Sequence, residues 1–280
     1  MLRLLALILA LTTTAHPTDT STRAVVASAA AYVAEYQQQL TYVLAEETYT
    51  QQVLALAPGD PAGIGPRVIR SETFFLFTAP QHGWMAIRDV MEVDDEAVRD
   101  RRSPLEALRK LPADEVAGEF KPYNSRFNIG RTYRNFNEPT LSLLPLTERH
   151  RGRFSFNRER VQREGDIVLV TLAFRERDSP TLIRDMKGRR IFSRGELVVE
   201  AATGRVRSAE LTARSADLRV RPTTEYAPEA RLGMWVPVRF REEYERGSQA
   251  AGRRGQEHER IHCEAVYANY RRFETSTRIR

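Results

Sequence analysis

The 280-residue sequence has very little cysteine and very little lysine, and each shortage excludes a class of protein. Cys263 is the single cysteine, so the chain can form neither an internal disulfide framework nor a metal site built from several cysteines. Arginine supplies almost all of the 43 basic residues, and these arginines are spread along the chain among 37 acidic residues. The net charge of +6 therefore arises without a basic stripe or arm that could follow a nucleic-acid backbone. We expect no nucleic-acid partner.

Motifs that would identify an enzyme are also scarce. The sequence has no Gly-x-Ser-x-Gly nucleophile elbow, and the GIG at residues 63–65 lacks the further glycine of a dinucleotide-binding loop. One sharp match remains, HERIH at residues 258–262, the zinc-hydrolase pattern in which a helix brings two imidazoles to one metal ion. Here the segment runs into a strand-like stretch, on which residues i and i+4 stand ~13 Å apart. We expect His258, Glu259 and His262 in a loop or at a strand start, with no metal, no cofactor and no catalytic residue; a zinc hydrolase is a minor alternative.

Long hydrophobic runs are absent after the first dozen residues. Behind Arg3, an apolar run covers residues 4–11, about half of the ~20 residues that cross a bilayer, and the small residues up to Ala15 suit signal-peptidase cleavage. No cysteine that could carry a lipid follows this run. We therefore predict a signal peptide over residues 1–15, no transmembrane anchor, and a mature protein in the periplasm or outside the cell. In that oxidising compartment a lone thiol is expected to be buried rather than reactive.

The pattern of the remaining sequence predicts one helix followed mainly by strands. Apolar residues recur every three or four positions over residues 21–40, which predicts an amphipathic helix. Two-residue alternation predicts a hairpin of strands at 68–77 and 84–93 and an antiparallel meander from 153 to 275. Residues 166–176 are apolar on both faces, which favours a strand near the centre of the sheet.

A helical insert separates the two groups of strands. Pro104 follows a serine, as at a capped helix start, and a second helical stretch is predicted at residues 114–127. No linker flanks residues 99–150, so we predict a single domain over residues 21–280 that contains this insert. The predicted fold class is α+β: a large curved antiparallel sheet, a half-barrel-like meander, with the N-terminal helix and the insert on its concave side.

Several segments of this chain resemble those of a known family. They are residues 83–90, 179–184, 195–206 (GELVVEAATGRV), 232–240 (LGMWVPVRF) and 267–273. With the order of signal peptide, helix, strand pair, insert and meander, they resemble periplasmic lipoprotein carriers of the LolA/LolB-like superfold and uncharacterised exported bacterial proteins of that architecture. The resemblance implies a curved sheet that leaves an apolar concavity for acyl chains. It transfers no carrier residue position by position.

The resemblance implies a non-catalytic, exported carrier for a lipid-like ligand such as a lipoprotein acyl chain. Such a concavity would be lined by apolar side chains of the strands, with the insert as plug or lid. Chosen for apolarity alone, the predicted ligand-binding residues are Phe75, Phe77, Trp84, Leu141, Leu144, Leu172 and Phe174. The alternative is an envelope interaction or structural protein that binds another protein and no small ligand.

Overall fold

The structure is a computed structural model that describes residues 19–55, 65–78, 83–134, 138–185, 187–247 and 259–273. The predicted signal peptide and His258 lie outside the described residues, and so do the side chains of Phe77 and Trp84, although the backbone of both lies in strands.

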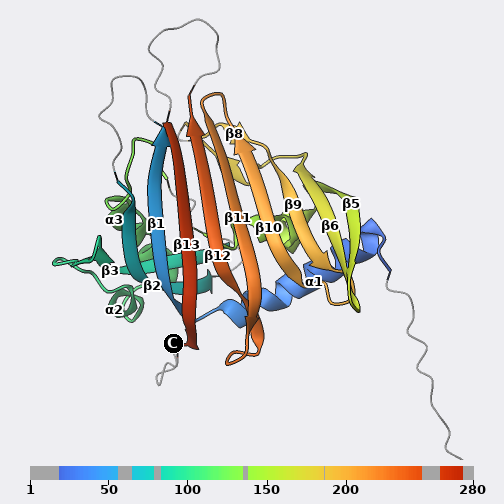
Figure 1. Cartoon of the computed structure of the whole chain (residues 1–280), viewed down its shortest axis with the longest axis horizontal. Coiled ribbons are helices and arrows are strands. Elements are labelled where there is room, and N and C mark those ends of the chain that lie inside the picture. The colour runs from blue at the N-terminus through green and yellow to red at the C-terminus, as the bar shows by residue number, and fades with distance from the viewer. Residues whose placement is uncertain are drawn as a thin grey trace, which may run out of the picture.

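Antiparallel strands dominate the described part of the chain. Eleven of them form one sheet in the order β4-β3-β2-β1-β13-β12-β11-β10-β9-β6-β5, and β7 pairs with β8 (Figure 1). The strands are β1 Val43–Ala55, β2 Arg67–Thr78, β3 Gly83–Val93, β4 Glu96–Ala97, β5 Phe154–Glu164, β6 Ile167–Glu176, β7 Ile183–Arg184, β8 Arg190–Ile191, β9 Ser193–Glu200, β10 Val206–Arg214, β11 Leu218–Glu229, β12 Met234–Arg246 and β13 Glu259–Arg272. The helices are α1 Thr22–Leu40, α2 Pro104–Leu108, α3 Ala113–Ser125, the 3₁₀ helix η1 Leu141–Leu146 and α4 Glu148–Arg151. The α+β class and the antiparallel sheet predicted from the sequence are confirmed.

The helix predicted at residues 21–40 is confirmed as α1. The Ser21 hydroxyl accepts a hydrogen bond from the backbone N–H of Ala24 at 3.3 Å and caps the helix. One stripe of α1 is fully buried against the sheet; it consists of Val25, Ala29, Val33, Tyr36 and Leu40. Figure 1 shows α1 crossing the strands from the β5 edge towards the base of β1. One face of the sheet is thus covered across most of its width.

The first and last parts of the chain form a single sheet. The final strand, β13, pairs with β1 along its length and with β12 on its other side, so the N-terminal hairpin and the C-terminal meander share one ladder of hydrogen bonds. Strand β13 thus has a neighbouring strand on each side and lies near the middle of the sheet. This position explains why Cys263 is buried, as the sequence predicted.

Strand β6 lies second from the edge, between β5 and β9, and the predicted central position of residues 166–176 is wrong. Its α1-facing side chains, including Leu172 and Phe174, are buried. On the opposite face Thr171 and Ala173 are half-buried. The same face also carries Leu169, which is buried, and Ile167, which is 39% exposed, so a strand that is apolar on both sides does not have to be central.

The insert at residues 99–150 contains α2, α3, η1 and α4, and it contributes to both faces of the sheet. On α3, Val116, Ala117 and Phe120 pack in a cluster with Leu44 and Phe74. The neighbours of these two strand residues in sequence, including Phe75, belong to the larger core that contains α1 and η1. Successive side chains of a strand point to opposite faces, so α3 covers the face away from α1, whereas η1 covers the α1 face.

Candidate functional site

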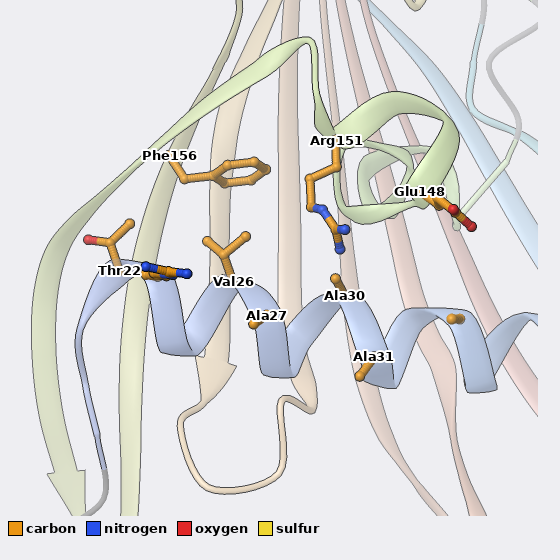
Figure 2. A pocket seen from close by; sticks show the side chains of 10 residues that line it. Thr22, Val26, Ala27, Ala30, Ala31, Glu148, Arg151 and Phe156 are labelled. Atoms are coloured by element: carbon orange, nitrogen blue, oxygen red, sulfur yellow. The ribbon is translucent and has the colours of Figure 1, made fainter.

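An open groove of about 810 Å³ lies on the outer side of α1, between this helix, α4 and the first half of β5. Figure 2 shows Val26, Ala27, Ala30 and Ala31 along α1, with Phe156 extending towards Val26 and Arg151 towards Ala30. The groove is lined by Thr22, Arg23, Val26, Ala27, Ala30, Ala31, Ala34, Glu148, Arg151 and Phe156. Its volume lies within the ~300–1,000 Å³ of ligand sites in proteins.

The outer face of α1 forms the floor of the groove and carries no charge over residues 24–34. Arg23 and Glu35 are the charged residues that border this stretch. A surface helix normally presents charged side chains opposite its buried stripe. On α1 these exposed positions are occupied by Ala27, Ala31 and Ala34 instead. Their small side chains leave the space that forms the groove.

Strand β5 supplies the apolar wall. Phe156 is half-buried and its ring lies 6.4 Å from that of Phe174, so the wall is continuous with the core. Arg158, two residues further on, donates hydrogen bonds to the carbonyl oxygen of Thr20 at 3.0 Å and to its hydroxyl at 3.1 Å. These bonds join Thr20, just before α1, to β5, beside the groove.

Charged side chains stand at the rim of the groove. Arg23 comes from α1, and Glu148 and Arg151 come from α4. His150 on α4 adds no charge at neutral pH, because burial and the neighbouring Arg153 lower its pKa to about 4. Two guanidinium groups against one carboxylate make the rim suited to an apolar ligand with an anionic head.

Of the seven residues predicted from the sequence to bind a ligand, the five whose side chains are described lie elsewhere. Leu172 and Phe174 are buried in the core that contains α1, and the Phe75 ring contacts those of Tyr267 and Tyr270, with ring centroids 5.8 and 6.2 Å apart. Leu141 and Leu144 are half-buried in η1. None of these five lines the groove, and the side chains of Phe77 and Trp84 are not described. Their contact with a ligand remains a prediction.

Sequence reasoning missed the alanines of α1. The apolar periodicity of residues 21–40 predicts the buried side of the helix and says nothing about the alanines on its exposed side. A usable signal was present in the same residues: a surface helix of this length without charge from residue 24 to residue 34.

The part of HERIH that is described lies at the start of β13, as predicted. The Glu259 carboxylate accepts hydrogen bonds from the backbone N–H groups of Arg131 and Thr132, at 2.6 and 2.7 Å, and so ties the insert to β13. His262 is three residues further along the strand and therefore points to the opposite face. Over the described residues, no group of three His, Cys, Asp or Glu side chains could hold a metal ion.

A buried ion pair, Glu47 with Arg88, occupies the α1 face of β1 and β3. The Arg88 guanidinium donates from Nη2 to Glu47 Oε1 at 2.7 Å and from Nε to Oε2, and Ser71 and Thr73 donate to the same carboxylate at 2.8 and 3.2 Å. Burial alone would raise the pKa of Glu47, but Arg88 holds it below the ordinary value. Because both oxygens of the buried carboxylate accept hydrogen bonds from the protein, this pair is structural.

A small polar cavity of about 30 Å³ lies beside this pair, where α3 meets the sheet. Arg88, Lys121, Arg134 and Glu138 line it, and the volume is sufficient for about two water molecules. Burial raises the pKa of Glu138 to about 7, against the opposing effect of Lys121. The cavity is too small for an organic ligand, so the α1 groove is the better candidate site.

No family model and no curated protein matches the sequence. Three solved structures are similar over most of both chains. A protein described as an outer membrane lipoprotein-sorting protein domain, from Vibrio parahaemolyticus, is 9% identical with a TM-score of 0.37, and the match covers 89% of this chain and 93% of the other. A LolA superfamily protein from Nitrosomonas europaea is 12% identical with a TM-score of 0.31, covering 92% and 96%. A DUF1329 family protein from Desulfovibrio piger is 10% identical with a TM-score of 0.34, covering 90% and 92%.

The description of the Nitrosomonas europaea protein names the LolA superfamily, whose architecture is the one expected from the sequence. At TM-scores below 0.5, the function has to be argued from the residues of this chain. Across the part of the chain that is described, no helix combines the length and apolarity needed to cross a membrane.

Proposed function

We propose that this protein is an exported, non-catalytic carrier that binds one acyl chain, or a ligand of similar shape and apolarity, in the groove on the outer side of α1. The observation that carries the proposal is the charge-free helix face of residues 24–34, which forms the floor of a groove of about 810 Å³. Uncharged side chains on an exposed helix face favour an apolar occupant.

The dimensions and the charges of the groove fit such a ligand. A linear chain lying along α1 would contact the methyl groups of Ala27, Ala31 and Ala34 and the ring of Phe156. Each methylene that is fully buried contributes ~0.8 kcal/mol. Because the groove is open on one side, only part of each methylene is covered, and binding stays reversible, as a carrier requires. Arg151 at the rim would pair with an anionic head group.

The first residues of the sequence support the export that we propose. The short basic start, the apolar run over residues 4–11 and the small residues up to Ala15 suit a cleaved signal peptide. The mature protein would then act in the periplasm or outside the cell, where lipids and lipoproteins in transit need their acyl chains covered. N-terminal sequencing of the exported protein should give a chain that starts at His16.

The binding test is a titration of the purified protein with a fluorescent fatty acid. In Ala31→Glu an exposed methyl on the floor of the groove becomes a charged side chain that occupies the groove. Gln38→Glu places the same charge on an exposed position of the same helix that does not line the groove. We expect at least a tenfold weaker affinity for Ala31→Glu, an unchanged affinity for Gln38→Glu, and the folded structure retained in both.

The outcome also separates the carrier from the alternative. If neither the wild type nor the variants bind the fatty acid, the carrier proposal is wrong, and the charge-free face of α1 is then better explained as a contact surface for another envelope protein. If Ala31→Glu binds as tightly as the wild type, the ligand lies elsewhere on the molecule.

A further inference from the structure

Four arginines gather on the sheet face that points away from α1. They line a pocket of about 470 Å³ over β6, β9, β10 and β11, together with Phe192 and Thr212. Arg175, Arg194, Arg214 and Arg219 are all exposed. Their neighbours in sequence, such as Phe174 and Val220, are buried on the α1 side, which places the four guanidinium groups on the opposite face.

The four arginines stand in like-charged cross-strand positions. Arg175 on β6 lies directly opposite Arg194 on β9, and Arg214 on β10 lies directly opposite Arg219 on β11. Thr212, opposite Arg194, joins the two pairs along β10. Like charges in directly opposed positions destabilise a sheet, so this arrangement costs stability unless an anion neutralises it.

Other arginines on the same face form ion pairs. Arg221 pairs with Glu243 at 2.6 Å, and Arg241 pairs with Glu225 at 2.7 Å and with Glu264 at 2.8 Å. Within the described residues, by contrast, none of the four arginines has a carboxylate within 4.0 Å. The contrast sets the four apart from an ordinary solvated sheet surface.

The acidic side chains nearest to the four arginines pair with other groups or lie in another row of the sheet. Glu245 lies opposite Arg219 but forms its ion pair with Arg260, at 3.8 Å. Glu176 at the base of the pocket is buried and accepts hydrogen bonds from Ser193. Glu196 and Glu210 face each other in the next row of the sheet. Among the residues that line the pocket, four guanidinium groups therefore stand against the single carboxylate of Glu176.

We propose that Arg175, Arg194, Arg214 and Arg219 form a binding site for phosphate groups. The guanidinium fork matches the geometry of phosphate oxygens and binds them in bidentate fashion. Two opposed pairs offer two such clamps, the Thr212 hydroxyl lies between them, and the exposed ring of Phe192 provides an apolar contact for the rest of the ligand. The phosphate can belong to a soluble molecule or to a lipid head group. The site lies on the opposite face from the α1 groove, so it does not depend on the proposed carrier function.

The test compares two double variants that remove the same charge from the same face. Arg194→Gln with Arg214→Gln takes one guanidinium from each opposed pair. Arg221→Gln with Arg239→Gln removes two arginines that already have carboxylate partners, Glu243 and Glu264. Binding of pyrophosphate is measured by calorimetry at low, constant ionic strength, and binding to vesicles is measured by sedimentation with phosphatidylglycerol and, separately, with phosphatidylcholine alone.

We expect the wild type to bind pyrophosphate or the phosphatidylglycerol vesicles, the Arg194/Arg214 variant to lose at least tenfold in affinity, and the Arg221/Arg239 variant to stay within threefold. The probe that binds identifies the source of the phosphate. Equal losses of affinity in both variants would show that binding depends on net charge alone, and they would overturn the proposal. A wild-type protein that binds neither pyrophosphate nor the phosphatidylglycerol vesicles would also overturn it. Without a ligand, the Arg194/Arg214 variant should melt at or above the wild-type temperature, because repulsion is relieved.

Discussion

At the residue scale, the buried charges of Glu47 and Arg88 contribute to the stability of the first three strands. Glu47 is fully buried, and its carboxylate is held by the guanidinium of Arg88 and by two hydroxyl groups. Removing one partner from a buried pair leaves the other charge without compensation, which costs far more than loss of a pair at the surface.

We therefore expect Arg88→Met to lower the free energy of unfolding by about 3–5 kcal/mol, measured by urea denaturation. Arg70 provides the control, since it pairs with Glu92 at 3.4 Å and with Asp95 at 3.2 Å on an exposed surface. Arg70→Met should cost no more than about 1 kcal/mol. Similar losses in the two variants would show that burial of the Glu47–Arg88 pair is not what makes it important.

Glu138 makes stability depend on pH. Its pKa is raised to about 7, whereas in the unfolded chain it has the ordinary value near 4.5. Between these values the folded state holds more protons than the unfolded state, so stability from this group is present at low pH and is lost as pH rises towards 7. Relative to Glu138→Gln, the free energy of unfolding of the wild type should fall by up to about 3 kcal/mol from pH 4.5 to pH 7.5. A difference between the two proteins that does not change with pH would contradict the assignment.

At the scale of elements, the packing of α1 on the sheet depends on a close approach at Gly204. This residue follows β9, has a φ of +71°, and a Cβ there would lie 2.2 Å from the carbonyl oxygen of Ser28 on α1. Only glycine allows the turn to touch the helix backbone.

Gly204→Ala should therefore cost about 2–5 kcal/mol, as the sum of left-handed backbone strain and overpacking. Gly165 has a similar φ of +60°, with nothing near the position of its Cβ, so Gly165→Ala should cost only the ~1–2 kcal/mol of strain. Thermal unfolding of both variants measures the difference. Equal costs would mean that α1 does not press on this turn.

Periodicity alone was sufficient to predict α1 and most of the strands, because each of these elements buries one face and shows it in the sequence. The position of β6 second from the edge could not be predicted, since the order of strands is set by pairing between distant residues such as those of β1 and β13. The same holds for the insert, whose division between the two faces depends on contacts that lie far apart in the sequence, such as that of Glu259 with Thr132.

At the scale of the whole molecule, the two faces of the sheet carry different chemistry. The α1 side has the apolar groove, and the far side has the exposed arginines of β6, β9, β10 and β11. Apolar residues in the sequence pointed to the core, where Leu172 and Phe174 pack under α1. The groove was not predicted, because alanine is neither strongly apolar nor bulky and its importance lies in the space it leaves.

The measurement that tests the carrier most directly is the position of a bound fatty acid, determined by NMR on protein with labelled alanine and leucine methyl groups. We predict nuclear Overhauser contacts from the acyl chain to the methyls of Ala27, Ala31 and Ala34, and none to Leu172, which is fully buried under α1. Contacts to Leu172 and Leu144 instead would mean that α1 and η1 move aside and that the ligand enters the core, and they would contradict binding in the α1 groove.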